Sequence, residues 1–263
     1  MNSSNKKNYS TNITNTFSWF SKKISRIVGL ISKITYKNVL NKIEYKKMLN
    51  HNEIKDRFII IYNKNLWSSK ESKSGEGSEV KQTKNLSLWL KKNLKKFKIN
   101  TFVDAPCGDL NWMRKILNKL DINYVGIDIV PQIIKKNKKN FSSKKIKFEV
   151  KNICSDKLPK CDLLMVRDCL FHLSYKDINK FLKNLRRTQY KYLLTTTHIE
   201  TNIINHDIVT GDFRTFDLFS SPFNFKKKDV IEKINDFSPN YKYNRKIMIL
   251  IKKKDVPVSI KFK

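Results

Sequence analysis

The segment Phe102–Met113 (FVDAPCGDLNWM) holds the residues whose types and spacing are best suited to chemistry. A short apolar run ends in Asp104, a Pro-Cys-Gly turn follows, and a helical pattern begins after it. Such a junction points backbone N–H groups and a helix dipole at a ligand, and Gly108 lets that ligand approach closely. About twenty residues later a second run ends in Asp128, where a carboxylate can accept both hydroxyls of a ribose. Together the two turns predict a ligand that contains a nucleoside.

The composition of the first turn narrows the choice of nucleoside. A dinucleotide fingerprint, G-x-G-x-x-G, makes room for a pyrophosphate, whereas this turn contains only Gly108. Asp104 and Asp109 flank that glycine, and their carboxylates would repel a pyrophosphate but suit a cationic or amine-bearing ligand. A nicotinamide-dependent oxidoreductase is therefore disfavoured.

These residues resemble the class I S-adenosylmethionine-dependent methyltransferases, whose first motif ends a strand in an acid and turns through glycine. Within that class the chain is similar to a group found in bacteria, algae and large viruses. Six segments carry the likeness, in this order: YNKNLWSSKESKSGEGSEVKQT (62–83), DAPCGD, GIDIVPQII, CDLLMVRDCLFHLS (161–174), YLLTTTH (192–198) and GDFRTFDLFSSPF (211–223). The resemblance covers about residues 62 to 252. It implies S-adenosylmethionine as cofactor and methyl transfer as activity, but no particular acceptor.

The resemblance also implies which residues contact the cofactor. Asp104 could instead cap a helix, but its place in the motif favours a cofactor contact. The loop from Trp67 to Ser78 would fold over the cofactor, although its Ser, Gly and charge content also fits a flexible linker. The expected cofactor contacts are Trp67, Ser74, Gly75, Gly77, Asp104, Pro106, Gly108, Asp109, Trp112, Asp128, Ile129, Asn152, Ile153 and Arg167, with Ser78 beside them in the loop.

Asn152 is a departure from the group, which usually has an acid at this place to contact the adenine amine. The amide oxygen can still accept that hydrogen bond, but without the charge assistance of a carboxylate. We therefore expect weaker cofactor binding, not its loss.

Asp168 and His172 follow the fourth predicted strand, where the class places residues that face the acceptor. Methyl transfer is a displacement at a carbon already activated by a sulfonium, so positioning supplies much of the rate. A hydroxyl acceptor must also lose its proton, and His172 or Asp168 is the candidate base. His172 is equally well explained as a residue hydrogen-bonded inside the fold. The sequence has no DPPY motif here, which disfavours methylation of the exocyclic amine of a base.

The long connection after the fifth strand contains His198, His206, Asp207 and Arg214. Connections of this length inside a compact domain are usually functional. We interpret the segment as an acceptor lid in which His198 and Arg214 contact the acceptor, with Arg214 as a clamp for an anionic group. It could equally be a structural cover for the sheet edge. Asp217 stands where the group usually has Asn, so the resemblance does not support a contact there.

The alternation of elements predicts an α/β fold, a Rossmann-like doubly wound seven-stranded methyltransferase sheet. Strands are expected over 101–104, 123–128, 146–151, 161–167 and 190–196 with a late strand in KYNRKIMILIKK, and helices over 83–97, 110–120, 131–140 and 175–187. We expect residues 1–16 to be disordered, 17–60 to form a basic helical extension, and 61–263 to form the methyltransferase domain. Residues 17–34 form an amphipathic pattern that suits either peripheral membrane contact or packing on the chain's own domain.

The formal charge of +32 and the pI of 10.0 suggest an anionic partner, but only eight of the 55 basic residues are Arg. Arg is the residue that reads phosphates and bases bidentately, so we favour a solvated lysine surface over a nucleic-acid site. The favoured acceptor is a sugar hydroxyl or another small oxygen acceptor, on a small molecule or glycan. Methylation of RNA or protein, and a non-catalytic cofactor-binding module anchored by its N-terminal helix, remain alternatives.

The four cysteines lack CxxC and metal-ligand spacing, so no metal is expected and the thiols should be reduced and buried. No apolar run approaches the length of a signal peptide or a membrane span. We accordingly expect a cytoplasmic monomer.

Overall fold

The computed structural model describes residues 41–200, 202–237 and 245–261 of the chain. It divides into two compact units, with the boundary between Lys47 and Met48. In the first unit, residues 41–47 are helical. The expectations for residues 1–16 and 17–34 lie outside the described residues. The helices from α2 onward and all seven strands belong to the unit that begins at Met48.

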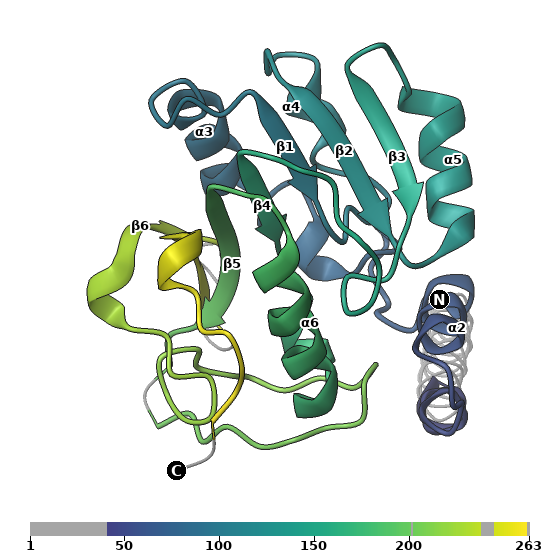
Figure 1. Ribbon diagram of the computed structural model, residues 1–263. Helices are drawn as coiled ribbons and strands as arrows, with labels where there is room; N and C mark the ends of the chain where they lie inside the picture. The colour runs from purple at the N-terminus through teal and green to yellow at the C-terminus, as the bar shows by residue number, and fades with distance from the viewer. Residues whose placement is uncertain (1–40, 201, 238–244, 262–263) are drawn as a thin grey trace, which may run out of the picture. The chain divides into compact units, whose positions relative to one another are not determined.

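The core of this unit is one seven-stranded sheet with the order β3-β2-β1-β4-β5-β7-β6 (Figure 1). The strands are β1 (Thr101–Asp104), β2 (Asn123–Asp128), β3 (Ile146–Val150), β4 (Leu163–Val166), β5 (Tyr192–His198), β6 (Val230–Asn235) and β7 (Lys246–Lys252). The neighbouring pairs among β1 to β5 are all parallel, whereas β7 runs antiparallel to both β5 and β6. The strand order reverses between β1 and β4, which places the ligand crevice of a doubly wound sheet at their carboxyl ends. The predicted fold class is confirmed.

The helices are α2 (Ile54–Lys64), α3 (Lys84–Asn93), α4 (Arg114–Leu117), α5 (Pro131–Phe141) and α6 (Tyr175–Arg187). Short 3₁₀ turns occupy Glu76–Ser78, Leu170–His172, Lys227–Asp229 and Lys253–Asp255. Helix α6 has the bounds that the sequence predicts because both its start and its apolar stripe are encoded locally. The Ser174 hydroxyl accepts from the Asp177 N–H at 3.2 Å and caps the helix.

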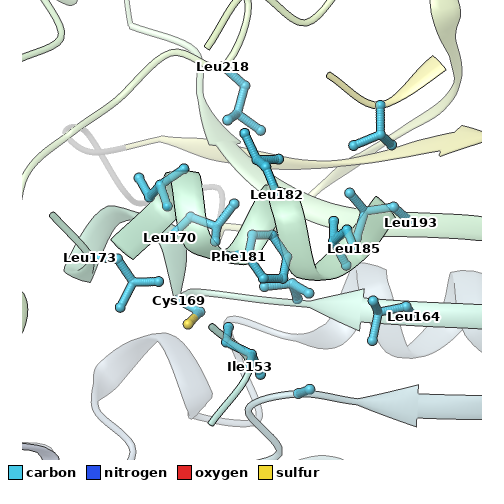
Figure 2. Packing of buried hydrophobic residues seen from close by; sticks show 14 of the residues in the cluster. Ile153, Leu164, Cys169, Leu170, Leu173, Phe181, Leu182, Leu185, Leu193 and Leu218 are labelled. Atoms are coloured by element: carbon cyan, nitrogen blue, oxygen red, sulfur yellow. The ribbon is translucent and has the colours of Figure 1, made fainter. Parts of the chain in front are cut away.

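Apolar side chains cover both faces of the sheet, as parallel strands require. On one face, Leu164 of β4 and Leu193 of β5 share a buried cluster with Phe181, Leu182 and Leu185 of α6 (Figure 2). On the other face, a second cluster joins α3 and the residues around α4 to the strands. Because strand residues alternate between these two clusters, the sheet is held from both sides and its carboxyl edge is left for the site.

Three expected helices differ from the structure. The helix expected over 110–120 is reduced to α4, because Leu110 has a φ of 58° and the chain turns before Arg114. The helix expected over 83–97 ends at Asn93. Within its described residues, the basic extension expected to be helical over 17–60 is interrupted at residues 50–53, and α2 then runs to Lys64.

The connection from β5 to β6 contains no α-helix among its described residues. It is the long irregular segment that the sequence predicts, and part of it packs on the α6 face of the sheet. Among the described residues no helix is both long and apolar enough to span a membrane.

Candidate active site

Two pockets that share residues lie at the carboxyl edge of the sheet. The first is lined by residues that follow β1, β2, β3 and β4, and by α2; the second is lined by the segment around Gly75, the residues after β4, and the start of β7. Trp67, Ser74, Asp168 and His172 belong to both linings. The geometry fits a two-substrate reaction, in which one ligand occupies each pocket and the reacting atoms meet where the pockets join.

Two buried carboxylates stand in the first pocket. Asp104, at the end of β1, is 2% exposed and accepts from the Tyr124 hydroxyl at 2.8 Å. Asp128, at the end of β2, accepts from the backbone N–H of Gly108 at 3.1 Å and of Val130 at 2.9 Å. Burial raises the pKa of Asp104 to about 7 and that of Asp128 to about 6. A carboxylate offers about four lone-pair sites, so Asp128 can still accept a hydrogen bond from a ribose hydroxyl.

The glycine turn after β1 serves two contacts. Gly108 lines the first pocket and has a φ of 57°. A Cβ atom there would lie 2.5 Å from the Ser74 hydroxyl oxygen, which accepts from the Asp109 N–H at 3.0 Å. The missing side chain therefore makes room for Ser74 at the edge of the pocket.

Asp109 differs from its predicted role as a cofactor contact. Its carboxylate accepts from the Ser72 hydroxyl at 2.9 Å and from the Lys73 N–H at 2.9 Å, and it does not line the first pocket. The acid thus ties residues 72–74 to the turn after β1. Its contribution to the cofactor pocket is indirect, through the segment that it holds.

Further contacts hold the segment 67–83 over the site. Asn111 donates from Nδ2 to the Glu71 carboxylate at 2.6 Å and to the Ser78 carbonyl at 3.0 Å. Arg167 donates from Nη2 to the Gly77 carbonyl at 2.7 Å. A Cβ at Gly77 would lie 2.5 Å from Asp168 Oδ2, so only glycine allows this approach. The segment is a fixed wall of both pockets, and the flexible-linker interpretation does not describe it.

The two residues after β3 that the sequence predicts to contact the cofactor line the first pocket. These are Asn152 and Ile153, and Pro106, Trp112 and Ile129 line the same pocket. The Asn152 Oδ1 atom already accepts from the Cys154 N–H at 2.9 Å. One lone pair of this oxygen remains for an adenine amine.

Helix α2 also contributes to the first pocket, through Ile54, Phe58 and Tyr62. Of these, only Tyr62 lies in a segment that carries the family resemblance. The apolar pair was missed because apolar residues spaced along a helix are the ordinary signature of core packing.

A four-membered charged network forms the floor between the pockets. Arg167 donates to Asp236 at 2.9 Å and lies 3.2 Å from the Asp168 carboxylate. Lys246 pairs with Asp168 and lies 3.4 Å from Asp236. Burial favours a raised pKa for Asp168, but the charges of Arg167 and Lys246 outweigh it and hold the pKa well below its usual range. Asp168 is thus a firmly paired carboxylate and a poor proton acceptor.

His172 is held in one tautomer. Its Nδ1 lies 2.7 Å from the Asp212 carbonyl oxygen, which can only accept, so Nδ1 carries the proton and Nε2 is free to accept one. The imidazole stacks on Trp67 with a centroid distance of 5.0 Å. Burial lowers the pKa of His172 to about 4. At neutral pH the side chain is therefore an uncharged imidazole at the junction of the two pockets.

The two residues expected to contact the acceptor lie in different surroundings. His198 lines the second pocket, and its Nδ1 accepts from the Phe216 N–H at 3.2 Å. Arg214 lines neither pocket: it is 2% exposed, donates to the Leu173 carbonyl at 2.8 Å and lies over the Tyr175 ring. The structure does not support Arg214 as a clamp for an anionic acceptor, because its side chain is enclosed in the fold.

The connection after β5 accordingly combines both of its proposed roles. Phe216, Leu218 and Phe223 are fully buried in the core cluster of the α6 face, as a structural cover would be. Phe213, in contrast, is 43% exposed and lines the second pocket.

Sequence reasoning did not single out Phe171, Phe213, Asp236 or Lys246, all of which line the second pocket. The register of the sheet could have located one of them. In the antiparallel ladder between β5 and β7, the backbone of Lys246 lies opposite that of His198. The start of β7 must therefore lie at the edge of the sheet where β5 ends.

A doubly wound sheet with an acid at the end of each of its first two strands, and a second pocket beside the first, suits a nucleoside-bearing cofactor with a second substrate beside it. Residues 102–189 match the family model of a methyltransferase domain. The chain is therefore an enzyme of the class of S-adenosylmethionine-dependent methyltransferases, and S-adenosylmethionine is its cofactor. The likeness to one group within the class stays a prediction.

Solved structures show the same fold at low sequence identity. Burkholderia thailandensis 1,6-didemethyltoxoflavin-N1-methyltransferase, solved with 1,6-didemethyltoxoflavin and S-adenosylhomocysteine bound, matches with a TM-score of 0.54 and 10% identity, over 76% of this chain and 86% of that one. A methyltransferase from Leishmania major matches with a TM-score of 0.52 and 15% identity, over 80% and 90%. Human N-acetylserotonin methyltransferase matches with a TM-score of 0.48 and 13% identity, over 74% of this chain and 58% of its own length. No curated protein matches the sequence.

Proposed function

We propose that the enzyme transfers a methyl group from S-adenosylmethionine to the hydroxyl oxygen of a small molecule, either a sugar hydroxyl or another small oxygen acceptor. The observation that carries this proposal is His172, a neutral imidazole that lines both pockets and whose Nε2 is free to accept a proton. An amine acceptor that binds as a free base would not need such a group, whereas a hydroxyl does.

The first pocket is the proposed cofactor site. Asp128 would accept the ribose hydroxyls, Asn152 the adenine amine, and Asp104 would face the cationic part of the ligand. The chemistry that the bound cofactor supplies is a methyl group on a positively charged sulfur, ready for displacement. The wall that contains Trp67 would cover both ligands and exclude water from them.

The bound cofactor would supply the methyl carbon to the acceptor oxygen, and the electron pair of the broken carbon–sulfur bond would remain on sulfur. The acceptor proton passes to Nε2 of His172 and then to solvent. Asp168 is a positioning residue in this proposal, because Arg167 and Lys246 hold its carboxylate in place and hold its pKa low.

The first test identifies the acceptor atom. The protein is incubated with cofactor labelled in the methyl group and with fractionated small-molecule and macromolecular extracts. We expect the label in a small-molecule fraction as a methyl ether, which resists mild base, whereas a methyl ester would release methanol. Label recovered in RNA or protein would contradict the proposal.

The second test addresses the base. His172→Asn keeps a donor for the Asp212 carbonyl but removes the proton acceptor, so we expect kcat to fall by roughly 10²–10⁴-fold. The dissociation constant for S-adenosylhomocysteine, measured by calorimetry, should stay within about twofold because the proposed cofactor contacts are unchanged. His206→Asn is the matched control, since His206 is exposed and lines neither pocket. Unchanged kcat in His172→Asn would remove this residue from the mechanism.

A further inference from the structure

Six ring-bearing side chains line the second pocket. Trp67, Phe171, Phe213 and Phe237 line it, together with the imidazoles of His172 and His198. The Phe171 ring meets the Phe213 ring edge to face, with centroids 5.5 Å apart and planes at 78°. Such edge-to-face clusters present both ring faces and ring edges to a ligand, and these suit a further aromatic ring.

Phe213 is the exposed member of this cluster. Its side chain is 43% exposed, while its ring centroid lies 5.8 Å from that of His172. An exposed phenylalanine beside the proposed base is not explained by core packing, because its neighbours Phe216 and Phe223 in the same connection are fully buried. A ligand ring that covered Phe213 would remove this apolar surface from water.

Three charged side chains of the second pocket are already paired. Asp168, Asp236 and Lys246 bond to one another or to Arg167. A sugar would bring several hydroxyl groups into this pocket, and each would need a partner to replace the water that it loses. An aromatic alcohol brings one hydroxyl, and His172 Nε2 can take it.

Resting on the proposed function, we infer that the acceptor is a planar aromatic ring that carries a hydroxyl group, with its ring against Trp67 and Phe213 and its oxygen at His172. Within the class of small oxygen acceptors, this assigns a phenol-type hydroxyl in preference to a sugar hydroxyl.

The strength of the proposed base is consistent with this assignment. A buried, neutral imidazole with a low pKa is a weak proton acceptor. A phenolic hydroxyl has a pKa of about 10, whereas an aliphatic hydroxyl ionises near the pKa of water, about 16. The phenolic proton therefore passes to His172 at a much lower cost in free energy.

The test uses three probes on protein saturated with S-adenosylhomocysteine, so that binding is measured without turnover. Phenol, cyclohexanol and methyl glucoside are titrated by ligand-observed NMR; cyclohexanol matches phenol in size but is not planar. We expect phenol to bind most tightly. Phe213→Ala should weaken phenol binding by about 2- to 12-fold, the range of one aromatic pair, and Phe213→Tyr should restore it.

The controls separate this inference from the proposed function. Ile204→Ala alters an 84% exposed residue of the same connection that lines neither pocket, and should leave phenol binding unchanged. Absence of S-adenosylhomocysteine binding would defeat the proposed function itself. Retained cofactor binding with methyl glucoside or cyclohexanol bound as tightly as phenol, or with phenol affinity unaffected by Phe213→Ala, would overturn only the aromatic acceptor.

Discussion

Burial disfavours the charged form of three ionisable residues in the site. It raises the pKa of Asp104 to about 7 and of Asp128 to about 6, and lowers that of His172 to about 4. Near neutral pH the imidazole is therefore uncharged, while the two carboxyls are close to their titration range. A cation that entered the first pocket would favour the ionised carboxylates and lower their pKa values again.

Cofactor affinity should consequently depend on pH. Between about pH 5.5 and 7.5 Asp104 and Asp128 lose their protons, so the affinity for the cationic cofactor should rise by roughly tenfold per carboxylate that must ionise. Calorimetric titrations with S-adenosylmethionine across this range measure the slope, and Asp104→Asn should flatten it. Asp121→Asn, at an exposed acid outside both pockets, is the control. An affinity that stays flat or falls over this range would contradict the assignment.

The same shifts fix the sign of a stability effect. The folded, unliganded protein holds protons on Asp104 and Asp128 at pH values where an unfolded chain, with carboxyl pKa values near 3.8, has released them. The free energy of unfolding contributed by these groups is therefore highest below pH 4 and declines as the pH rises through 6 to 7. Cofactor binding should oppose this decline, because it stabilises the ionised site.

Among the helices and turns, the sequence correctly predicted the features that contacts between nearby residues determine. Helix α6 matches its expected bounds because Ser174 caps it and its apolar residues recur at helical spacing. The helix expected over 110–120 fails because Leu110 adopts a left-handed conformation, which the residue type does not announce. The role of Asp109 could not be predicted from the local sequence either, because its partners Ser72 and Lys73 are more than thirty residues away in the chain.

Segment 67–83 offers an element-scale test through Asp109. Asp109→Asn removes the charge that accepts from Ser72 and Lys73, which should cost roughly 1–2 kcal/mol of the contacts that hold the segment closed. We expect cofactor release to require this wall to open, so S-adenosylhomocysteine should dissociate about 5- to 30-fold faster. Stopped-flow fluorescence of Trp67 and Trp112, which line the first pocket, reports the rate.

The matched control is Asp56→Asn, at an exposed acid of α2 that lines neither pocket. It should release the ligand at the rate of the unaltered protein. If Asp109→Asn did so too, the segment would be a static wall and release would follow another route.

The net charge of the whole chain acts on the cofactor in the opposite direction to the buried acids of the site. The formal charge of +32 repels a cationic cofactor at long range, while the buried acids of the first pocket attract it at short range. Salt screens the long-range repulsion more strongly than it screens the buried contacts. The lysine surface therefore disfavours the cofactor slightly at low salt, and favours any polyanionic partner strongly.

Salt dependence distinguishes the proposed small aromatic acceptor from RNA at this scale. An acceptor without charge gains nothing from the lysine surface, so its kcat/KM should change by less than about threefold between 50 and 200 mM salt. An RNA acceptor that neutralised its charge at six to ten phosphates would lose roughly 10³–10⁵ in affinity over the same range. Turnover of phenol and methyl transfer to RNA are measured separately at saturating cofactor, and S-adenosylhomocysteine binding at each salt concentration is the control for changes in the first pocket. Methyl transfer to RNA that falls steeply with salt while cofactor binding stays constant would contradict the small aromatic acceptor, because only an acceptor held by many surface cations responds to salt so strongly.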